Sequence, residues 1–144
     1  MIRILSLLAT ATVISFAGFA ETAPSTSSLT VNLSGLSPQT GAVMIGVYAG
    51  EDDYENGGGI TGATVEITAD TATVTIEGLE PGAYGLKMYH DSNGNGQMDT
   101  NPFGMPTEPY AFSNNAKGRF GPAEWDSAAF QVTAGDNSHD IAFD

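Results

Sequence analysis

Alternation of apolar and polar residues at every second position is the feature that most limits what this sequence can fold into. Leu29, Val31 and Leu33 alternate with polar residues, and similar segments recur to the end of the chain. Successive side chains of a β-strand point to opposite faces, so this pattern predicts half-buried strands. The predicted strands are 29–34, 42–48, 63–67, 72–76, 83–89, 129–133 and 139–143.

Three of these segments carry more specific predictions. The range 42–48 is apolar on both faces, which is typical of a central strand. The ranges 63–67 and 72–76 flank a tight turn at Ala69 and Asp70, and they predict a β-hairpin. No helical period follows the N-terminal segment. We therefore expect a single antiparallel β-sandwich of about seven strands, immunoglobulin-like or transthyretin-like, with one long ordered loop.

The first twenty residues resemble a secretory signal peptide. Arg3 precedes an apolar run over 4–16, and Gly18 and Ala20 are small residues of the kind that a signal peptidase recognises. We therefore expect a signal peptide over 1–20, a flexible leader over 21–28 and the sandwich domain over 29–144. This organisation predicts a periplasmic or extracellular protein with no membrane span after cleavage.

The charge and the cysteine content exclude several classes of function. The chain has four Lys and Arg against seventeen Asp and Glu, a formal net charge of −13. Nucleic-acid binding depends on clustered Lys and Arg, so no nucleic-acid partner is expected. The chain has no cysteine, and His90 and His139 are far apart in sequence, which disfavours a transition-metal site and excludes a disulfide framework.

The segment 90–101, HDSNGNGQMDTN, has the spacing of a calcium-binding loop. Oxygen-bearing side chains stand at every second position, and Gly96 follows where such a loop turns sharply. Hard oxygen ligands in this register favour calcium, and their number favours it over magnesium. The alternative is an ordinary turn rich in Asn, Asp and Gly. The predicted ligands within the loop are Asp91, Asn93, Asn95, Gln97 through its backbone carbonyl, and Asp99.

The loop departs from a full EF-hand at its last position. Pro102 stands where the twelfth residue would supply a bidentate carboxylate. Glu108 is the next carboxylate along the chain, so we name it as the candidate final ligand. The acidic range 49–59 is a second glycine-rich segment, and the sequence leaves open whether it joins the site.

The range 101–128 shows little periodicity but carries five aromatic residues. Loops of this length are usually functional or are packed by their own side chains. Packing of the aromatics onto the sandwich is the first interpretation. Exposed aromatics would instead indicate a carbohydrate or envelope-protein partner. The aromatics are Phe103, Tyr110, Phe112, Phe120 and Trp125.

Several short phrases occur in this part of the chain: His90-Asp91, 93–99, 103–106, 108–110, 113–115 and 120–122. Together they resemble the bacterial domain-of-unknown-function family 2141. The resemblance covers nearly all of the chain after the signal peptide, and it implies no particular activity. The range 78–84 is also similar to the turn that enters a strand in transthyretin-like and carboxypeptidase-regulatory-like sandwiches.

Catalysis is the less favoured hypothesis. His90 and Asp91 are neighbours on a predicted strand, so their side chains should point to opposite faces. Ser113 has no adjacent motif of a nucleophile, and no cofactor-binding motif occurs. The alternative function is a metal-assisted hydrolase of cell-envelope material, with Asp91, Asp99 and Glu108 at its centre. The favoured hypothesis is a non-catalytic module whose calcium loop orders a binding or structural surface.

Overall fold

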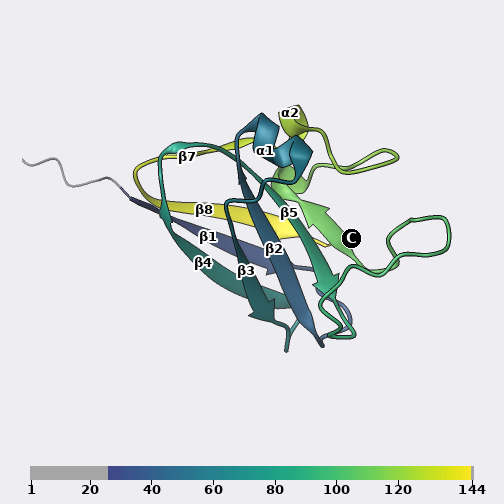
Figure 1. Cartoon of the computed structure of the whole chain (residues 1–144). Helices are drawn as coiled ribbons and strands as arrows, with labels where there is room; N and C mark the ends of the chain where they lie inside the picture. Colours follow the sequence, from purple (N-terminus) through teal and green to yellow (C-terminus); the bar gives the residue numbers. More distant parts are fainter. Residues whose placement is uncertain (1–25, 144) are drawn as a thin grey trace, which may run out of the picture.

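The computed structural model describes residues 26–143, which form two β-sheets packed face to face (Figure 1). The three-stranded sheet has the order β4 (Thr71–Leu79), β1 (Ser27–Ser34), β8 (Gly135–Ala142). The five-stranded sheet has the order β3 (Thr61–Glu66), β2 (Ala42–Ala49), β5 (Gly82–Asp91), β6 (Tyr110–Phe112), and β7 (Phe130–Val132) also pairs with β5. The predicted β-sandwich is confirmed.

The core lies between the sheets and uses the alternate residues of each strand. In β1 the side chains of Leu29, Val31 and Leu33 are buried, while their neighbours face outward. In β5 the inward residues are Tyr84, Leu86 and Met88, as the alternation predicts. The other large contributors to this core are Leu36, Val43, Ile45, Val47, Ile67, Ile76, Leu79, Val132, Ile141 and Phe143.

The predicted hairpin between 63–67 and 72–76 is wrong. β3 pairs with β2 in the larger sheet, whereas β4 pairs with β1 in the smaller one. The connection crosses between sheets at Ile67, which is 2% exposed and donates its backbone N–H to the carbonyl of Gly41. Two strands on facing sheets bury one face each in a common core, so they show the same alternation as a hairpin.

The two sheets are not wholly antiparallel. β1 and β8 run parallel over their whole length, from Ser27 opposite Gly135 to Ser34 opposite Ala142. The alternation of a strand does not depend on its direction, so the sequence carried no sign of this pair.

Short helices occupy segments that were predicted as loops. The acidic segment forms α1 (Glu51–Asn56), which ends at Gly57 in the left-handed conformation. Three acids in the first turn of α1 lie where the helix dipole favours negative charge. The long segment 101–128 contains β6, the 3₁₀ helix η1 (Ser113–Asn115) and α2 (Trp125–Ala128). The long loop is therefore ordered, as expected, but it also contains regular elements.

The predicted signal peptide lies outside the described residues, as does most of the predicted leader. β1 begins at Ser27, two residues before the predicted start of the domain at 29. Within residues 26–143 no helix has the length and hydropathy needed to cross a membrane.

His139 joins β8 to η1 and gives the fold a pH-dependent contact. Its Nε2 accepts a hydrogen bond from the backbone N–H of Asn114 at 2.9 Å, and its ring stacks on Phe130 with centroids 4.2 Å apart. Burial lowers the pKa of His139 below its usual 6.5, and the Asp140 carboxylate offsets part of that shift.

We expect this contact to make the domain less stable in mild acid. The folded state disfavours protonated His139, so its contribution is complete above pH 6.5 and is lost as pH falls through the lowered pKa. Melting temperatures at pH 7.5 and pH 5.0 test this, with His139→Gln as a variant whose side chain does not titrate. The wild type should lose more on acidification than the variant; equal losses would contradict the prediction.

Candidate functional site

The predicted metal ligands lie at the end of β5 and in the connection from β5 to β6. Asp91 is the last residue of β5, and Tyr110 is the first residue of β6. β5 pairs with both β2 and β6, so the connection leaves from the middle of the larger sheet. In Figure 1 the loop 92–100 lies at the end of the sandwich opposite α1 and α2.

Asp91 organises the loop through its carboxylate. Its Oδ1 accepts the backbone N–H groups of Gly94 and Asn95 at 2.8 and 3.1 Å, and its Oδ2 accepts that of Gly96 at 2.7 Å. The residue is 3% exposed, whereas the loop around it is largely exposed. Gly94 and Gly96 have φ near +75°, at 73° and 77°, which glycine adopts without strain. Asp91 therefore fixes the path of the loop.

Three further predicted ligands meet beside it. The Asp99 carboxylate accepts the side-chain amide N–H of Asn93 on Oδ2 and that of Asn95 on Oδ1, at 2.5 and 2.8 Å. The carbonyl oxygens of the two amides accept the backbone N–H groups of Asn95 and Gln97. The loop thus gathers one carboxylate and two amide side chains on its outer surface.

Glu108 reaches back to the loop from the segment before β6. Its Oε1 accepts the backbone N–H of Ser92 at 3.0 Å, and its Oε2 accepts that of Asp99 at 3.2 Å. The side chain is 6% exposed. One carboxylate therefore bridges the start and the end of the loop, although Glu108 lies nine residues beyond Asp99 in sequence.

The remaining predictions concern the convergence of the acids, the residue Gln97 and the acidic segment 49–59. Within the described chain, no group of three or more His, Cys, Asp or Glu side chains is arranged to hold a metal ion, so the carboxylates of Asp91, Asp99 and Glu108 do not converge on one point. The side chain of Gln97 is exposed, and its backbone N–H bonds Asn95. The acidic segment 49–59 is remote, because Ala49 pairs with Tyr84 while Ala42 pairs with Asp91. That segment therefore does not join the loop.

His90 and Ser113 have structural contacts. His90 is fully buried, and its Nε2 bonds the carbonyl oxygen of Thr40 at 2.7 Å, on the face of β5 opposite Asp91. The hydroxyl of Ser113 is also buried; it donates to the carbonyl of Ala128 and accepts the backbone N–H of Leu86. Both side chains therefore bond backbone groups of the sandwich, and the Nδ1 of His90 is buried without a hydrogen-bond partner among the described residues.

A small hairpin follows directly from Asp99. Its carbonyl accepts the N–H of Thr107, and Thr100 forms a bridge with Pro106. At the tip, the Asn101 side-chain oxygen accepts the backbone N–H groups of Phe103 and Met105 at 2.9 and 3.0 Å. We call residues 99–107 the wall hairpin. Its first residue is a predicted ligand, so the loop and the hairpin form one continuous structure.

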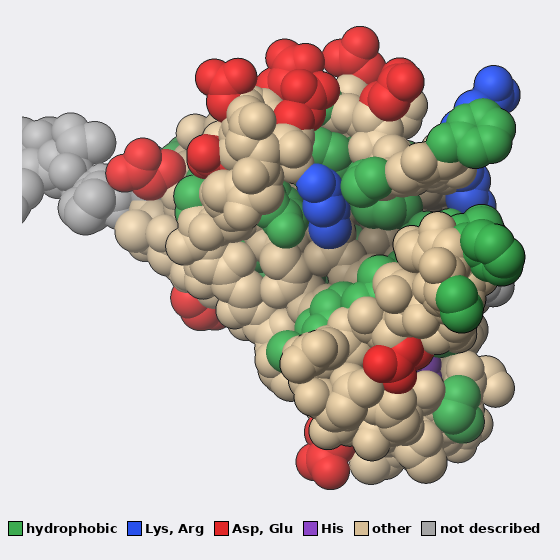
Figure 2. Space-filling view, turned by 45° about the vertical axis from the view of Figure 1, so that its right-hand side comes forward, with side chains coloured by type: hydrophobic (Ala, Val, Ile, Leu, Met, Phe, Trp, Pro, Cys, Tyr) green, Lys and Arg blue, Asp and Glu red, His purple; other side chains and the backbone are tan. Residues whose placement is uncertain are grey.

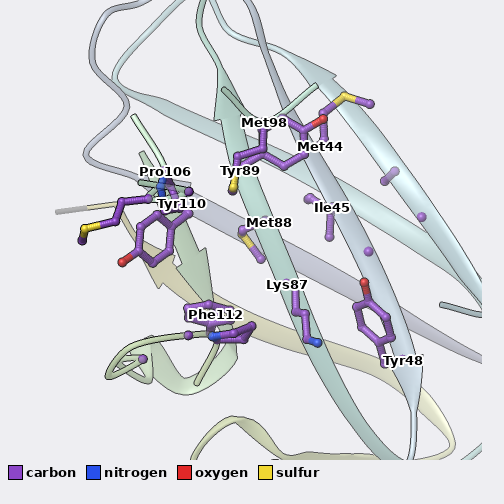
Figure 3. Close-up of a pocket in the computed structure, with 18 of the residues that line it drawn as sticks. Met44, Ile45, Tyr48, Lys87, Met88, Tyr89, Met98, Pro106, Tyr110 and Phe112 are labelled. Carbon is purple, nitrogen blue, oxygen red and sulfur yellow. The ribbon is translucent and has the colours of Figure 1, made fainter. Parts of the chain in front are cut away.

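A groove of about 920 Å³ lies between the wall hairpin and a second loop, residues 118–122. Both loops project from the same side of the molecule (Figure 1), and Figure 2 shows the hollow between them with apolar side chains along it. The floor is the outer face of the larger sheet, where side chains of β2, β5 and β6 lie side by side (Figure 3). The labelled lining residues are Met44, Ile45, Tyr48, Lys87, Met88, Tyr89, Met98, Pro106, Tyr110 and Phe112.

The aromatics of 101–128 divide between packing and exposure. Phe112 is 7% exposed, and the Trp125 ring packs against Tyr54 with centroids 5.6 Å apart. Phe103 and Phe120 are 90% and 114% exposed at the tips of the two loops. Packing onto the sandwich therefore describes only part of this set.

The apolar pattern of 42–48 is related to the groove as well as to the core. The two apolar faces of 42–48 predicted a strand covered on both sides. Val43, Ile45 and Val47 do face the core, but Met44 and Tyr48 face the groove. An apolar outer face on a strand that has no layer above it indicates a binding surface as well as a central strand.

Comparison with known proteins identifies a family but no characterised relative. A family model described as "Uncharacterized protein conserved in bacteria (DUF2141)" matches residues 31–140. No curated protein and no solved structure matches the chain.

Proposed function

Because the chain belongs to the DUF2141 family, whose description names no activity, we propose a function from its own residues: an exported, non-catalytic binding module with a calcium loop. The loop would take up calcium and so hold the wall hairpin in place beside the groove. The carrying observation is that Asp99, with the Asn93 and Asn95 side chains gathered on its carboxylate, also begins that hairpin.

The chemistry of the gathered groups suits a hard cation. Asp99 supplies carboxylate oxygens, and Asn93 and Asn95 supply amide oxygens; the carboxylates of Asp91 and Glu108 bond the loop backbone and add negative charge near it. A carboxylate has about four lone-pair sites, so the oxygens that accept N–H groups keep further acceptor capacity. Calcium takes six to eight oxygens, and water can complete what the side chains do not fill. The imidazole of His90 is buried against the carbonyl of Thr40, and Met98 lines the groove, so the gathered side chains offer only oxygen, which favours calcium over zinc or copper.

The buried carboxylates of Asp91 and Glu108 already hold the backbone of this connection, and calcium would add to them at its exposed side chains. The Asn93 and Asn95 contacts with Asp99 are exposed, and such bonds compete with water. A divalent cation shared by these groups would hold the end of the loop, and with it the first residue of the wall hairpin. Calcium would therefore act on the shape of the groove without contacting its occupant.

Calorimetric titration of calcium into chelator-treated protein tests the proposal. We expect saturable binding with a Kd of ~0.1–1 mM, the range of extracellular calcium modules. Calcium at ten times the Kd should raise the free energy of unfolding by about 1.4 kcal/mol. Asp99→Asn should abolish both effects, whereas Asp70→Asn, at an exposed turn of the chain, should keep them. Absence of heat and of any change in melting temperature would refute the calcium role.

A metal-assisted hydrolase remains the second candidate, around the same Asp91, Asp99 and Glu108. The carboxylates at 3% and 6% exposure already accept backbone N–H groups, which favours a structural role for Asp91 and Glu108 over a catalytic one. Turnover of an envelope-derived substrate that is lost in Asp99→Ala would favour the hydrolase instead.

A further inference from the structure

The groove combines an apolar lining with a single cationic group. Three of the four methionines of the described residues, Met44, Met98 and Met105, have accessible side chains along it, whereas Met88 borders it from the core and is 3% exposed. Methionine side chains are flexible and polarisable, and they are frequent at surfaces that adapt to apolar ligands. The volume of the groove, about 920 Å³, lies within the usual range of small-molecule sites.

The register of the sheet places Lys87 in a low part of the floor. Lys87 lies opposite Gly46 of β2 on one side and Phe112 of β6 on the other, and Gly46 lies opposite Gly62 of β3. Two of the four residues in this row have no side chain. The next row, Thr64–Met44–Tyr89–Tyr110, is filled by side chains. The missing side chain at Gly46 leaves room for the Tyr48 side chain, whose hydroxyl oxygen would lie 3.0 Å from a Cβ at that position, so the lysine and the Tyr48 ring share the floor.

The Lys87 ammonium is held toward α1. It donates a hydrogen bond to the backbone carbonyl of Tyr54, and it lies 4.1 Å from the centroid of the Tyr54 ring and 4.9 Å from that of Tyr48. An ammonium has three N–H donors, and the Tyr54 carbonyl takes one of them. Figure 3 shows the side chain between Tyr48 and Phe112, on the floor of the groove.

The charge of the groove is opposite to that of the chain. The formal net charge is −13, yet none of the Asp and Glu residues in the described part of the chain lines the groove. The acid whose charge acts on Lys87 is Glu55, in α1 outside the lining. Figure 2 shows the acidic side chains gathered mainly above the hollow and a basic side chain at its edge. This arrangement selects an occupant with one negative charge on an apolar body.

We propose that the groove binds a free fatty acid, with its carboxylate at Lys87 and its acyl chain along the accessible methionines toward the wall hairpin. The inference deepens the binding role proposed above by naming the ligand class, and it does not depend on the calcium loop. One lysine balances the single charge of a carboxylate, whereas a phosphate would bring more negative charge than it can balance.

Other occupants fit the lining less well. A peptide would bring backbone N–H and C=O groups onto a floor of methionine and aromatic side chains, where they would lack partners. An acyl chain has no such groups. A second copy of the chain would bring two strongly acidic molecules together, which charge repulsion opposes.

Calorimetric titration with dodecanoate, kept below its micelle concentration, tests the proposal on the whole protein. Dodecyltrimethylammonium has the same chain length with the opposite charge and is the matched ligand control. We expect one dodecanoate per chain and at least about tenfold weaker binding of the cationic ligand. Equal affinity for the two head groups, or no saturable binding of dodecanoate, would overturn the proposal.

Variants of the two charges separate the roles of head group and groove. Lys87→Met removes the positive charge but keeps a side chain of similar length, and it should weaken dodecanoate binding about tenfold. Lys117→Met, at a residue that does not line this groove, should leave dodecanoate binding unchanged. Glu55→Gln should strengthen dodecanoate binding by about twofold at low salt, because one competing negative charge is removed. Unchanged affinity in Lys87→Met, with an unchanged melting temperature, would contradict the assigned carboxylate position.

The same titrations in calcium and in chelator distinguish this inference from the proposed calcium role. Dodecanoate binding that persists when calcium neither binds nor stabilises would leave the fatty-acid groove standing and refute the calcium loop. Calcium binding without any dodecanoate binding would refute the groove alone. Light scattering at each step identifies a dimer, which would assign the groove to a second copy and overturn the proposal.

Discussion

Replacing Asp91 by alanine is expected to lower the free energy of unfolding by about 2–4 kcal/mol. The change removes the carboxylate that accepts three backbone N–H groups, those of Gly94, Asn95 and Gly96. The loop is largely exposed, so water can replace part of this bonding, and the loss should fall below the sum of three charge-assisted bonds. Urea unfolding of wild type and variant gives the difference directly.

Asp91→Asn provides a graded comparison. Its remaining oxygen can still accept from Gly94 and Asn95, but its amide group would face the N–H of Gly96. We expect a loss between zero and that of alanine, together with faster hydrogen exchange at the Gly96 amide. Asp70→Ala, at an exposed turn, should change stability by less than about 0.5 kcal/mol. If Asp91→Ala behaves like Asp70→Ala, the carboxylate does not fix the loop.

The strands could be predicted because burial of one face requires an apolar residue at every second position. This alternation does not identify the sheet in which a strand lies. β3 and β4 each bury one face in the same core, and only the inward turn at Ile67 separates them into different sheets. β6 has three residues, Tyr110–Phe112, which is too short a segment to show a period. Its pairing with β5 depends on residues far away in sequence.

The hydrogen-bonded path of the loop could be predicted because its contacts are local, whereas its calcium binding stays a prediction. Asp91 bonds groups three to five residues away, and Asp99 bonds Asn95 four residues before it. The groove was missed because it depends on register across several strands. Lys87 gains its surroundings from Gly46 and Gly62 on neighbouring strands and from Tyr54 on α1. Glu108 lies between these cases, since its contacts with Ser92 and Asp99 require the whole connection to fold back.

Replacing Gly41 by alanine is expected to be more damaging than any change within the loop itself, with a loss of about 3–5 kcal/mol. Gly41 has φ of 76°, a conformation that costs other residues about 1–2 kcal/mol. A Cβ at this position would also lie 2.0 Å from the carbonyl oxygen of Asp91 and 2.8 Å from the Cα of Ser92. Both are backbone atoms, so relief requires β5 and the loop to move.

Gly78→Ala separates the two causes of this loss. Gly78 has nearly the same φ, 77°, but a Cβ there would meet no atom within 4 Å. It should therefore lose only the conformational cost, about 1–2 kcal/mol. The difference between the two variants measures the close approach of Gly41 to the start of the loop. If calcium binding also weakens in Gly41→Ala but not in Gly78→Ala, the backbone at Asp91 and Ser92 must keep its position for the loop to bind. Equal losses of stability in the two variants would show instead that the loop moves aside without cost, and that the end of β5 does not hold it rigidly.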